Sequence, residues 1–213
     1  MKIFALLIAM TCLTAVSAFS EPPVHQGEHG TTMPHMKAVT RAEIGSPAPP
    51  FSLDAVVNLE FKKVSLSDYQ GKWVVLFFYP GDFTFVCPTE IKGFNRSLDE
   101  FKKVNTEVLA VSADSKFSHM AWIKSGALEK LDYPLLSDFS KQTAREYGVL
   151  DKAQSTARRG LFIIDPKGII QHMVIHSDKV GRSVEETLRV LKALQTEELC
   201  PINWKPGDKT IKR

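Results

Sequence analysis

The order of apolar and polar positions predicts strands and helices that alternate along most of the chain. A continuous apolar run at residues 73–79 (WVVLFFY) is typical of a central strand buried on both faces. After it, apolar residues recur at steps of three and four from Ile91 to Val104, which predicts an amphipathic helix. Further strands are expected at 51–57, 61–66, 106–112 and 133–136, and further helices at 116–124 and 141–147.

The C-terminal third predicts a hairpin followed by one last helix. Two apolar segments, 160–165 and 168–175, are joined by Asp-Pro-Lys-Gly, which is a β-hairpin signature. Ser183 with Glu186 three residues later forms a capping box that opens a helix. Strands and helices in this order predict an α/β fold around one sheet. Because we find no internal repeat and no linker, we expect a single domain at residues 43–213.

The N-terminal segment has a different pattern. Residues 1–18 contain one basic residue, an apolar run and small residues ending at Ala18, the layout of a secretory signal peptide cleaved after that position. A membrane anchor is the alternative, but the run falls short of the ~20 residues that span a bilayer. We therefore expect no membrane partner and a protein secreted across a membrane, with the periplasm favoured and the endoplasmic reticulum lumen or the extracellular space as alternatives.

Residues 19–42 are expected to form a flexible lead-in, since they carry Pro, Gly, Thr and His without an apolar period. Their histidines and methionines could bind a soft metal such as copper. No fixed ligand spacing supports that interpretation, so a solvated tail is preferred and no metal site is predicted.

Composition then limits the classes of function. The chain has 213 residues, of which 44% are hydrophobic, enough to bury a core after loss of the leader. Charged residues nearly balance and leave a formal net charge of +3, and no long basic run is present. A nucleic-acid partner is therefore not expected.

Three cysteines are present, and Cys12 is expected to leave with the leader, so that Cys87 and Cys200 remain. A static structural disulfide is one interpretation of such a pair. Cys87 falls in the first turn of the helix predicted after residue 86, where free N–H groups and the helix dipole stabilise a thiolate. Thr84 has a hydroxyl that can accept a hydrogen bond from one group while donating to another, so it could orient a thiolate. Alone these signals are weak, because a lone cysteine is more often a small buried hydrophobe.

Residues 77–90 (FFYPGDFTFVCPTE) closely resemble the peroxidatic motif of the peroxiredoxins, in which Pro, three residues, Thr or Ser, and two residues precede Cys. The resemblance extends from about residue 44 to residue 209. Segments 159–165 and 180–188 are similar to the typical two-cysteine subgroup, the thioredoxin peroxidase or alkyl hydroperoxide reductase type, and 198–207 resembles its resolving-cysteine segment.

The resemblance implies a thioredoxin-like fold with a central mixed sheet flanked by helices. It also implies antioxidant reduction of hydrogen peroxide and organic hydroperoxides without a metal, haem or other cofactor, using a thioredoxin-like reductant. By matching position, Cys87 is the peroxidatic nucleophile, and Pro80, Thr84 and Arg159 complete its pocket. Glu90 occupies a position that supports the neighbouring network, although a solvated acid at a helix N-terminus is the alternative.

The neighbouring Arg158 could be mistaken for the active arginine, but the family motif places that arginine directly before Gly160, which selects Arg159. Its permanent charge and fork of donors suit a thiolate and the departing oxygen of a peroxide. Oxidation would convert Cys87 to a sulfenic acid that condenses with a thiol. The resemblance implies that Cys200 of the partner subunit supplies this thiol within a homodimer, and in related proteins such dimers often assemble into a ring of five.

Two other classes of function share features with this sequence. A thioredoxin-like disulfide carrier uses the same fold and a cysteine at a helix start, but it would have Cys-x-x-Cys, and the third residue after Cys87 is Glu90. A holdase chaperone is the non-enzymatic alternative, and it would keep its activity without the Cys87 thiol.

Overall fold

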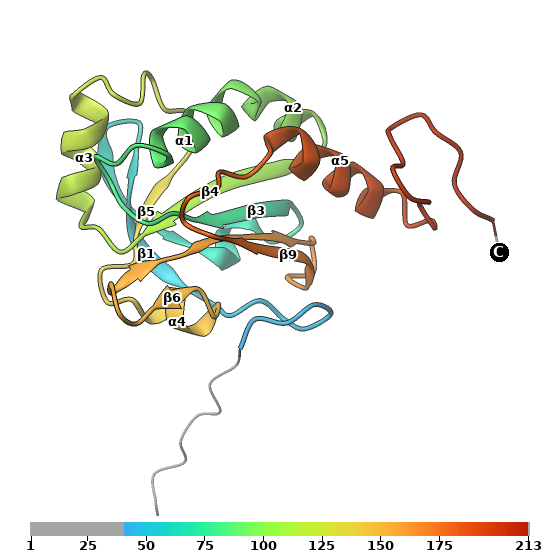
Figure 1. Cartoon of the computed structure of the whole chain (residues 1–213), viewed down its shortest axis with the longest axis horizontal. Coiled ribbons are helices and arrows are strands. Elements are labelled where there is room, and N and C mark those ends of the chain that lie inside the picture. Colours follow the sequence, from blue (N-terminus) through green and yellow to red (C-terminus); the bar gives the residue numbers. More distant parts are fainter. Residues whose placement is uncertain (1–40, 213) are drawn as a thin grey trace, which may run out of the picture. The chain divides into compact units, whose positions relative to one another are not determined.

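The apolar run at residues 73–79 contains β3 (Trp73–Phe78), an inner strand of a seven-stranded sheet with the order β2-β1-β5-β4-β3-β8-β9 (Figure 1). The computed structural model describes residues 41–212. The strands are β1 (Ser52–Val57), β2 (Glu60–Ser65), β3 (Trp73–Phe78), β4 (Thr106–Ser112), β5 (Leu135–Ser137), β6 (Leu150–Asp151), β7 (Thr156–Ala157), β8 (Arg159–Ile164) and β9 (Ile170–His176). The helices are the 3-10 helix η1 (Leu66–Tyr69) and α1 (Cys87–Arg96), α2 (Leu98–Lys103), α3 (Lys116–Lys124), α4 (Gln142–Glu146) and α5 (Val184–Gln195).

The sheet is mixed, as the resemblance implied. Strand β3 is parallel to β4 and antiparallel to β8, so it is buried between two neighbours. Strands β8 and β9 form the expected antiparallel hairpin, and β9 is the last strand of the sheet. The antiparallel register places the beginning of β8 beside the end of β3, because Leu161 pairs with Phe77.

Helices cover both faces of the sheet, and alternate residues of β3 point to opposite layers. Val75 and Phe77 pack in a core that includes residues of α1, α2, α3 and α5. Val74 and Leu76 pack on the other side, where α4 contributes to the core. Figure 1 shows this division, with α1, α2 and α5 on one side of the sheet and α4 on the other.

Some local elements differ from the expected pattern. The single helix that was predicted to begin around Cys87 and to continue to Val104 is two helices, α1 and α2, which are separated at Ser97. The apolar period continues through the break because both helices pack on the same face of the sheet. The small hairpin of β6 and β7 was not predicted, since strands of two residues are too short to show a period of two.

The predicted signal peptide at residues 1–18 lies outside the described residues, as does the predicted flexible segment apart from its last two residues. Ala42, one of these two, is buried, and its amide donates to the Glu146 carbonyl at 3.0 Å. Ala42 is therefore part of the folded domain, which was expected to begin at residue 43. Between residues 41 and 212, no helix has the length and apolar character required to cross a membrane.

Candidate active site

Cys87 is the first residue of α1, as the sequence predicts, and its residue is fully buried. Strand β3 ends at Phe78, and a short loop carries the chain from there to the helix start. Such positions beyond the carboxyl ends of parallel strands are where α/β sheets bind ligands. Pro88, the second residue of α1, suits this place because its missing N–H would have no partner within the helix.

Arg159 lies beside Cys87 because β8 begins next to the end of β3. Its Nη1 donates to the Cys87 Sγ at 3.5 Å and to the Glu90 Oε2 at 2.6 Å. The Nε donates to the Asp178 carbonyl at 2.8 Å, which holds the guanidinium in place. Arg158, by contrast, is exposed and pairs with Asp151. Of the two neighbouring arginines, only Arg159 contacts the thiol within the described residues.

The ionisation states in this cluster are set by its own charges. Burial by itself would raise the pKa of the Glu90 carboxyl, but the Arg182 and Arg159 guanidinium groups hold it below its usual range. Burial would lower the pKa of Arg159, but its hydrogen bond to Cys87 and the charge of Glu90 raise it. The site therefore keeps a carboxylate between two guanidinium cations.

Arg182 is a central residue of the cluster, to which sequence reasoning assigned no role. It forms a fork with Glu90, with Nε to Oε1 at 2.7 Å and Nη2 to Oε2 at 2.9 Å. Its Nη1 donates to the carbonyls of Phe78 and Gly160 at 2.8 and 2.7 Å, and so ties β3 to β8. The sequence does offer a signal for Arg182, because this arginine lies in segment 180–188, which was already recognised as similar to the family.

Gly160 follows Arg159 at a point where there is no space for a side chain. A Cβ atom at this position would overlap the side chain of Val149. The glycine therefore lets β8 lie close to Val149, just before β6. This close packing holds the beginning of β8, and with it Arg159, in position.

The structure places Pro80 and Thr84 in the loop between β3 and α1. Pro80 is half-buried directly after the strand. Thr84 is exposed, and its hydroxyl donates to the Gly81 carbonyl at 2.9 Å. In the described part of the chain no hydrogen bond joins Thr84 to Cys87, so its proposed role toward a bound peroxide stays a prediction.

A buried polar network around Asp82 holds the loop between β3 and α1 in place. Sequence reasoning did not identify this network. Asp82 accepts hydrogen bonds from Tyr79 at 2.8 Å and Ser118 at 2.7 Å, and it lies 2.8 Å from the His119 Nδ1. The other ring nitrogen of His119 faces the Leu136 carbonyl at 3.1 Å and must donate to it. Burial raises the pKa of Tyr79 well above its ordinary value, so its phenol stays protonated.

Cys200 is half-buried and lies beyond the C-terminal end of α5. Its sulfur lies 3.5 Å from the Thr196 Oγ1 and 3.8 Å from the Ala193 carbonyl. Arg182 precedes α5 at the Cys87 end, and this 12-residue helix is about 18 Å long at 1.5 Å per residue. Figure 1 shows the chain continuing from α5 away from α1. The two cysteines are free thiols at opposite ends of this helix.

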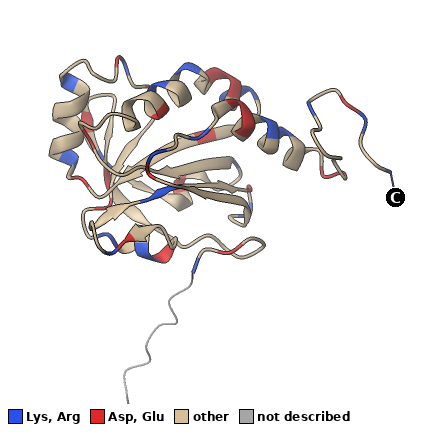
Figure 2. Ribbon diagram, in the orientation of Figure 1, with Lys and Arg blue, Asp and Glu red and all other residues tan. Residues whose placement is uncertain are grey.

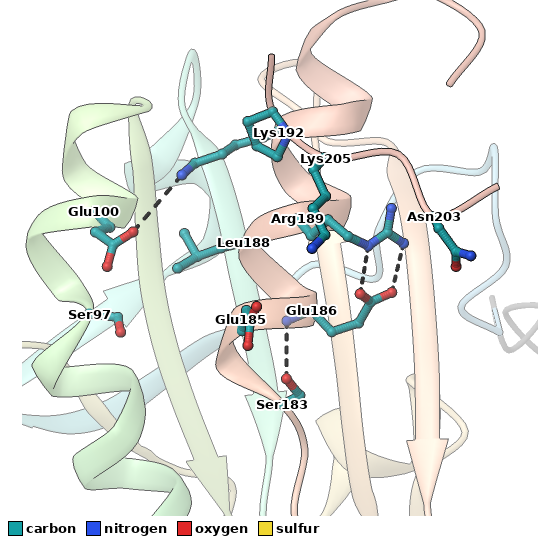
Figure 3. Close-up of a pocket in the computed structure, with 11 residues that line it drawn as sticks. Ser97, Glu100, Ser183, Glu185, Glu186, Leu188, Arg189, Lys192, Asn203 and Lys205 are labelled. Atoms are coloured by element: carbon teal, nitrogen blue, oxygen red, sulfur yellow. Dashed lines mark hydrogen bonds and ion pairs between the residues drawn. The ribbon is translucent and has the colours of Figure 1, made fainter. Parts of the chain in front are cut away.

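A cavity of about 820 Å³ lies between α5 and the segment that follows Cys200 (Figure 3). Arg189 points into it and forms a fork with Glu186 at 2.6 and 2.7 Å. The Arg189 Nη1 also donates to the Trp204 carbonyl at 3.0 Å, which ties the C-terminal segment to α5. The residues that line this cavity do not include Cys87, so it is separate from the thiol site. In residues 41–212, no cluster of His, Cys, Asp and Glu side chains could hold a metal ion.

Comparison with known proteins finds relatives that match most of the chain. Residues 44–173 match the AhpC/TSA family. The chain is 55% identical over 179 residues to the chloroplastic 2-Cys peroxiredoxin BAS1 of Arabidopsis thaliana, which covers 79% of the chain and 67% of that relative. It is 50% identical over 210 residues to the mitochondrial thioredoxin-dependent peroxide reductase of Mus musculus, covering 95% of the chain and 80% of that relative.

Solved structures agree with this match. The reduced 2-Cys peroxiredoxin of Plasmodium vivax superposes with a TM-score of 0.76 at 39% identity, covering 79% of this chain and 92% of that one. AhpC of Mycobacterium tuberculosis gives a TM-score of 0.67 at 39% identity, with 71% and 97% covered. These neighbours confirm the thioredoxin-like fold that the motif implied.

The expectation of a secreted protein in the periplasm, the endoplasmic reticulum lumen or the extracellular space is wrong. Relatives with about half of their residues identical are named as chloroplastic or mitochondrial proteins. Several kinds of targeting segment combine basic and apolar residues at the N-terminus, so this pattern alone does not determine the compartment. The case for redox-active cysteines therefore rests on the chemistry of the site.

Proposed function

The chain belongs to the AhpC/TSA family as a 2-Cys peroxiredoxin, and from this we infer that it is a thiol peroxidase of antioxidant defence, with Cys87 as the residue that attacks the peroxide. The observation that carries the assignment of Cys87 is the Arg159 guanidinium 3.5 Å from its sulfur at the start of α1. A cation and a helix N-terminus both favour a thiolate, the nucleophilic form of a cysteine.

In the proposed first step, the Cys87 thiolate attacks one oxygen of a hydroperoxide. The O–O bond breaks, and its electron pair leaves on the other oxygen, which takes up a proton to become water or an alcohol. The sulfur is oxidised to a sulfenic acid. Arg159 donates to the sulfur and to the departing oxygen, and Glu90 with Arg182 keeps the guanidinium in position. Pro80 and Thr84 complete the pocket.

In the proposed second step, the Cys200 thiol condenses with the sulfenic acid to form a disulfide and water. The length of α5 separates the two cysteines of one chain, which favours Cys200 of the partner subunit as the resolving thiol. Because Cys87 is fully buried in the first turn of α1, that turn must open before the disulfide can form. A thioredoxin-like reductant then restores both thiols; the mouse and human relatives are named thioredoxin-dependent peroxide reductases.

Replacing Cys200 by serine should leave the first oxidation intact and prevent the disulfide, because Cys87 and its pocket do not contact the second thiol. One equivalent of peroxide should then leave a sulfenic acid on Cys87, which dimedone traps and intact-mass analysis detects. The wild-type protein should instead show a disulfide-linked dimer on a non-reducing gel. A peroxide-dependent dimer in the variant, or no adduct on Cys87, would contradict the assignment.

Two surfaces support assembly into a homodimer and a ring of dimers. Strand β9 ends the sheet, and beyond its first residue, which hydrogen-bonds to residues 45 and 46, its outer edge has no strand partner within the described residues; antiparallel pairing of two β9 strands would generate a two-fold dimer. Near the active site, exposed aromatic side chains gather on the loop before α1 and around α3, where a second contact could form. They are Phe83 and Phe85 on the loop, Phe117 on α3, and Phe61, whose ring centroid lies 5.3 Å from that of Phe117.

Replacing Ile175 by lysine should weaken the dimer, because the two-fold axis would bring two like charges into one strand pairing. Ile175 lies on β9 and is 41% exposed. Sedimentation velocity should show a shift toward monomer at micromolar protein. Leu59→Lys is the matched control, since Leu59 is also exposed but lies in the turn between β1 and β2, at the opposite edge of the sheet from β9. Equal assembly of the two variants would argue against β9 as the interface.

A further inference from the structure

A cavity of about 390 Å³ lies on the α4 side of the sheet, opposite the layer that holds Cys87. It is lined by Arg41, Arg145, Gly148, Leu150 and Lys152. Three of these five residues carry a positive charge, and within residues 41–212 no acidic residue lines the cavity. The composition of its wall is therefore that of a site for an anion.

The three cations come from three different segments that the fold brings together. Arg41 begins the described chain, which is fixed here by the hydrogen bond from the Ala42 amide to the Glu146 carbonyl. Arg145 lies in the last turn of α4, and Lys152 lies in the turn between β6 and β7. Figure 2 shows basic residues on α4 and at the beginning of the described chain, on the same side of the sheet.

Gly148 lets one of the arginines lie directly over the backbone. It has a φ of +71°, in the left-handed region, and a Cβ added there would lie 3.4 Å from the Arg41 Nε. The glycine thus ends α4 and leaves room for the guanidinium beside the cavity. This contact joins the beginning of the described chain to the turn after α4.

No ion pair balances the charges of the cavity in the described part of the chain. Arg41, Arg145 and Lys152 form no ion pair with a carboxylate there. Of the adjacent carboxylates, Asp151 pairs with Arg158, and Glu146 accepts a hydrogen bond from Gln142 and does not line the cavity. Three cations around one cavity repel one another, and a bound anion would relieve that repulsion.

We propose that this cavity binds a phosphate group, either as free orthophosphate or as part of a nucleotide. Guanidinium groups present forks of N–H donors that match the oxygens of a phosphate, and an ammonium adds a point charge. A dianionic phosphate balances three cations better than a single carboxylate does. The volume of about 390 Å³ is also within the range of small-ligand sites.

The test titrates the full-length protein by isothermal calorimetry with orthophosphate and, separately, with ADP, at constant ionic strength in potassium chloride. Saturable binding of either probe is expected, and ADP that binds more tightly than orthophosphate would identify a nucleotide as the source of the phosphate. Arg145→Ala and Lys152→Ala should each weaken binding about tenfold, the effect of losing one charge-assisted hydrogen bond. Arg145→Lys should weaken it less than Arg145→Ala.

Lys167→Ala is the matched control, because Lys167 is an exposed cation in the turn between β8 and β9 that forms no ion pair within residues 41–212 and does not line the cavity. It should leave the affinity for phosphate unchanged, and all of these variants should keep the wild-type rate of peroxide reduction. Absence of saturable binding by both probes, or an equal loss of affinity in Lys167→Ala and Arg145→Ala, would overturn the proposal.

Discussion

Arg159→Ala should slow the attack of Cys87 on a hydroperoxide by about 10²–10³-fold, the effect of removing one electrostatic group from an active site. The Arg159 Nη1 lies 3.5 Å from the sulfur, and the variant loses both that donor and the positive charge beside the thiolate. Stopped-flow measurement of peroxide consumption by the pre-reduced protein gives the rate constant directly. Arg159→Lys should recover part of the loss, because a point charge does not reproduce a planar fork.

Arg158→Ala is the control for this experiment, since Arg158 is adjacent in sequence but is exposed and directed to Asp151. It should react with peroxide at the wild-type rate. A near-native rate in Arg159→Ala together with a slow Arg158→Ala would show that the other arginine acts on the thiol.

Glu90→Gln should lower the free energy of unfolding by about 3–5 kcal/mol, the range found when one member of a buried ion pair is removed. Glu90 is buried and accepts hydrogen bonds from both Arg159 and Arg182, so the amide would leave two buried cations without a compensating charge. Urea unfolding of the reduced protein measures the change. Glu186→Gln removes an exposed pair with Arg189 and should cost only about 0–1 kcal/mol. Equal losses in the two variants would contradict a stabilising role for the buried cluster.

The same carboxylate predicts how stability depends on pH. The pKa of Glu90 is lowered in the folded protein, so its contribution is fully present above the unfolded value of about 4.3. The contribution is lost as the pH falls through the lower, folded pKa. Glu90→Gln should lack this part of the acid-induced loss, which a series of urea titrations between neutral pH and acid would detect.

The hydrophobic pattern determined the secondary structure well where an element packs one face on the core. Strand β3 and helix α3 occur where the pattern predicts them, and the hairpin of β8 and β9 forms around its predicted turn. Ser183 caps α5 by accepting from the Glu186 amide at 3.1 Å, as its spacing indicated, whereas the Glu186 carboxylate pairs with Arg189 and does not complete the predicted capping box. These features depend on neighbours in the chain, so a local pattern contains the information needed to predict them.

The sequence by itself also determined the family, through the motif around Cys87, and the choice of Arg159 over Arg158. Only the tertiary structure revealed that Arg182 closes the buried cluster, because its contact with Glu90 joins residues 92 positions apart. The same holds for the network of Asp82 and His119 beneath the loop. A local pattern reports which face of an element is apolar, but it does not report which distant polar groups meet. Those contacts form only when β3 and β8 pair in the sheet. Their pairing brings the start of α1, the start of β8 and the segment before α5 together.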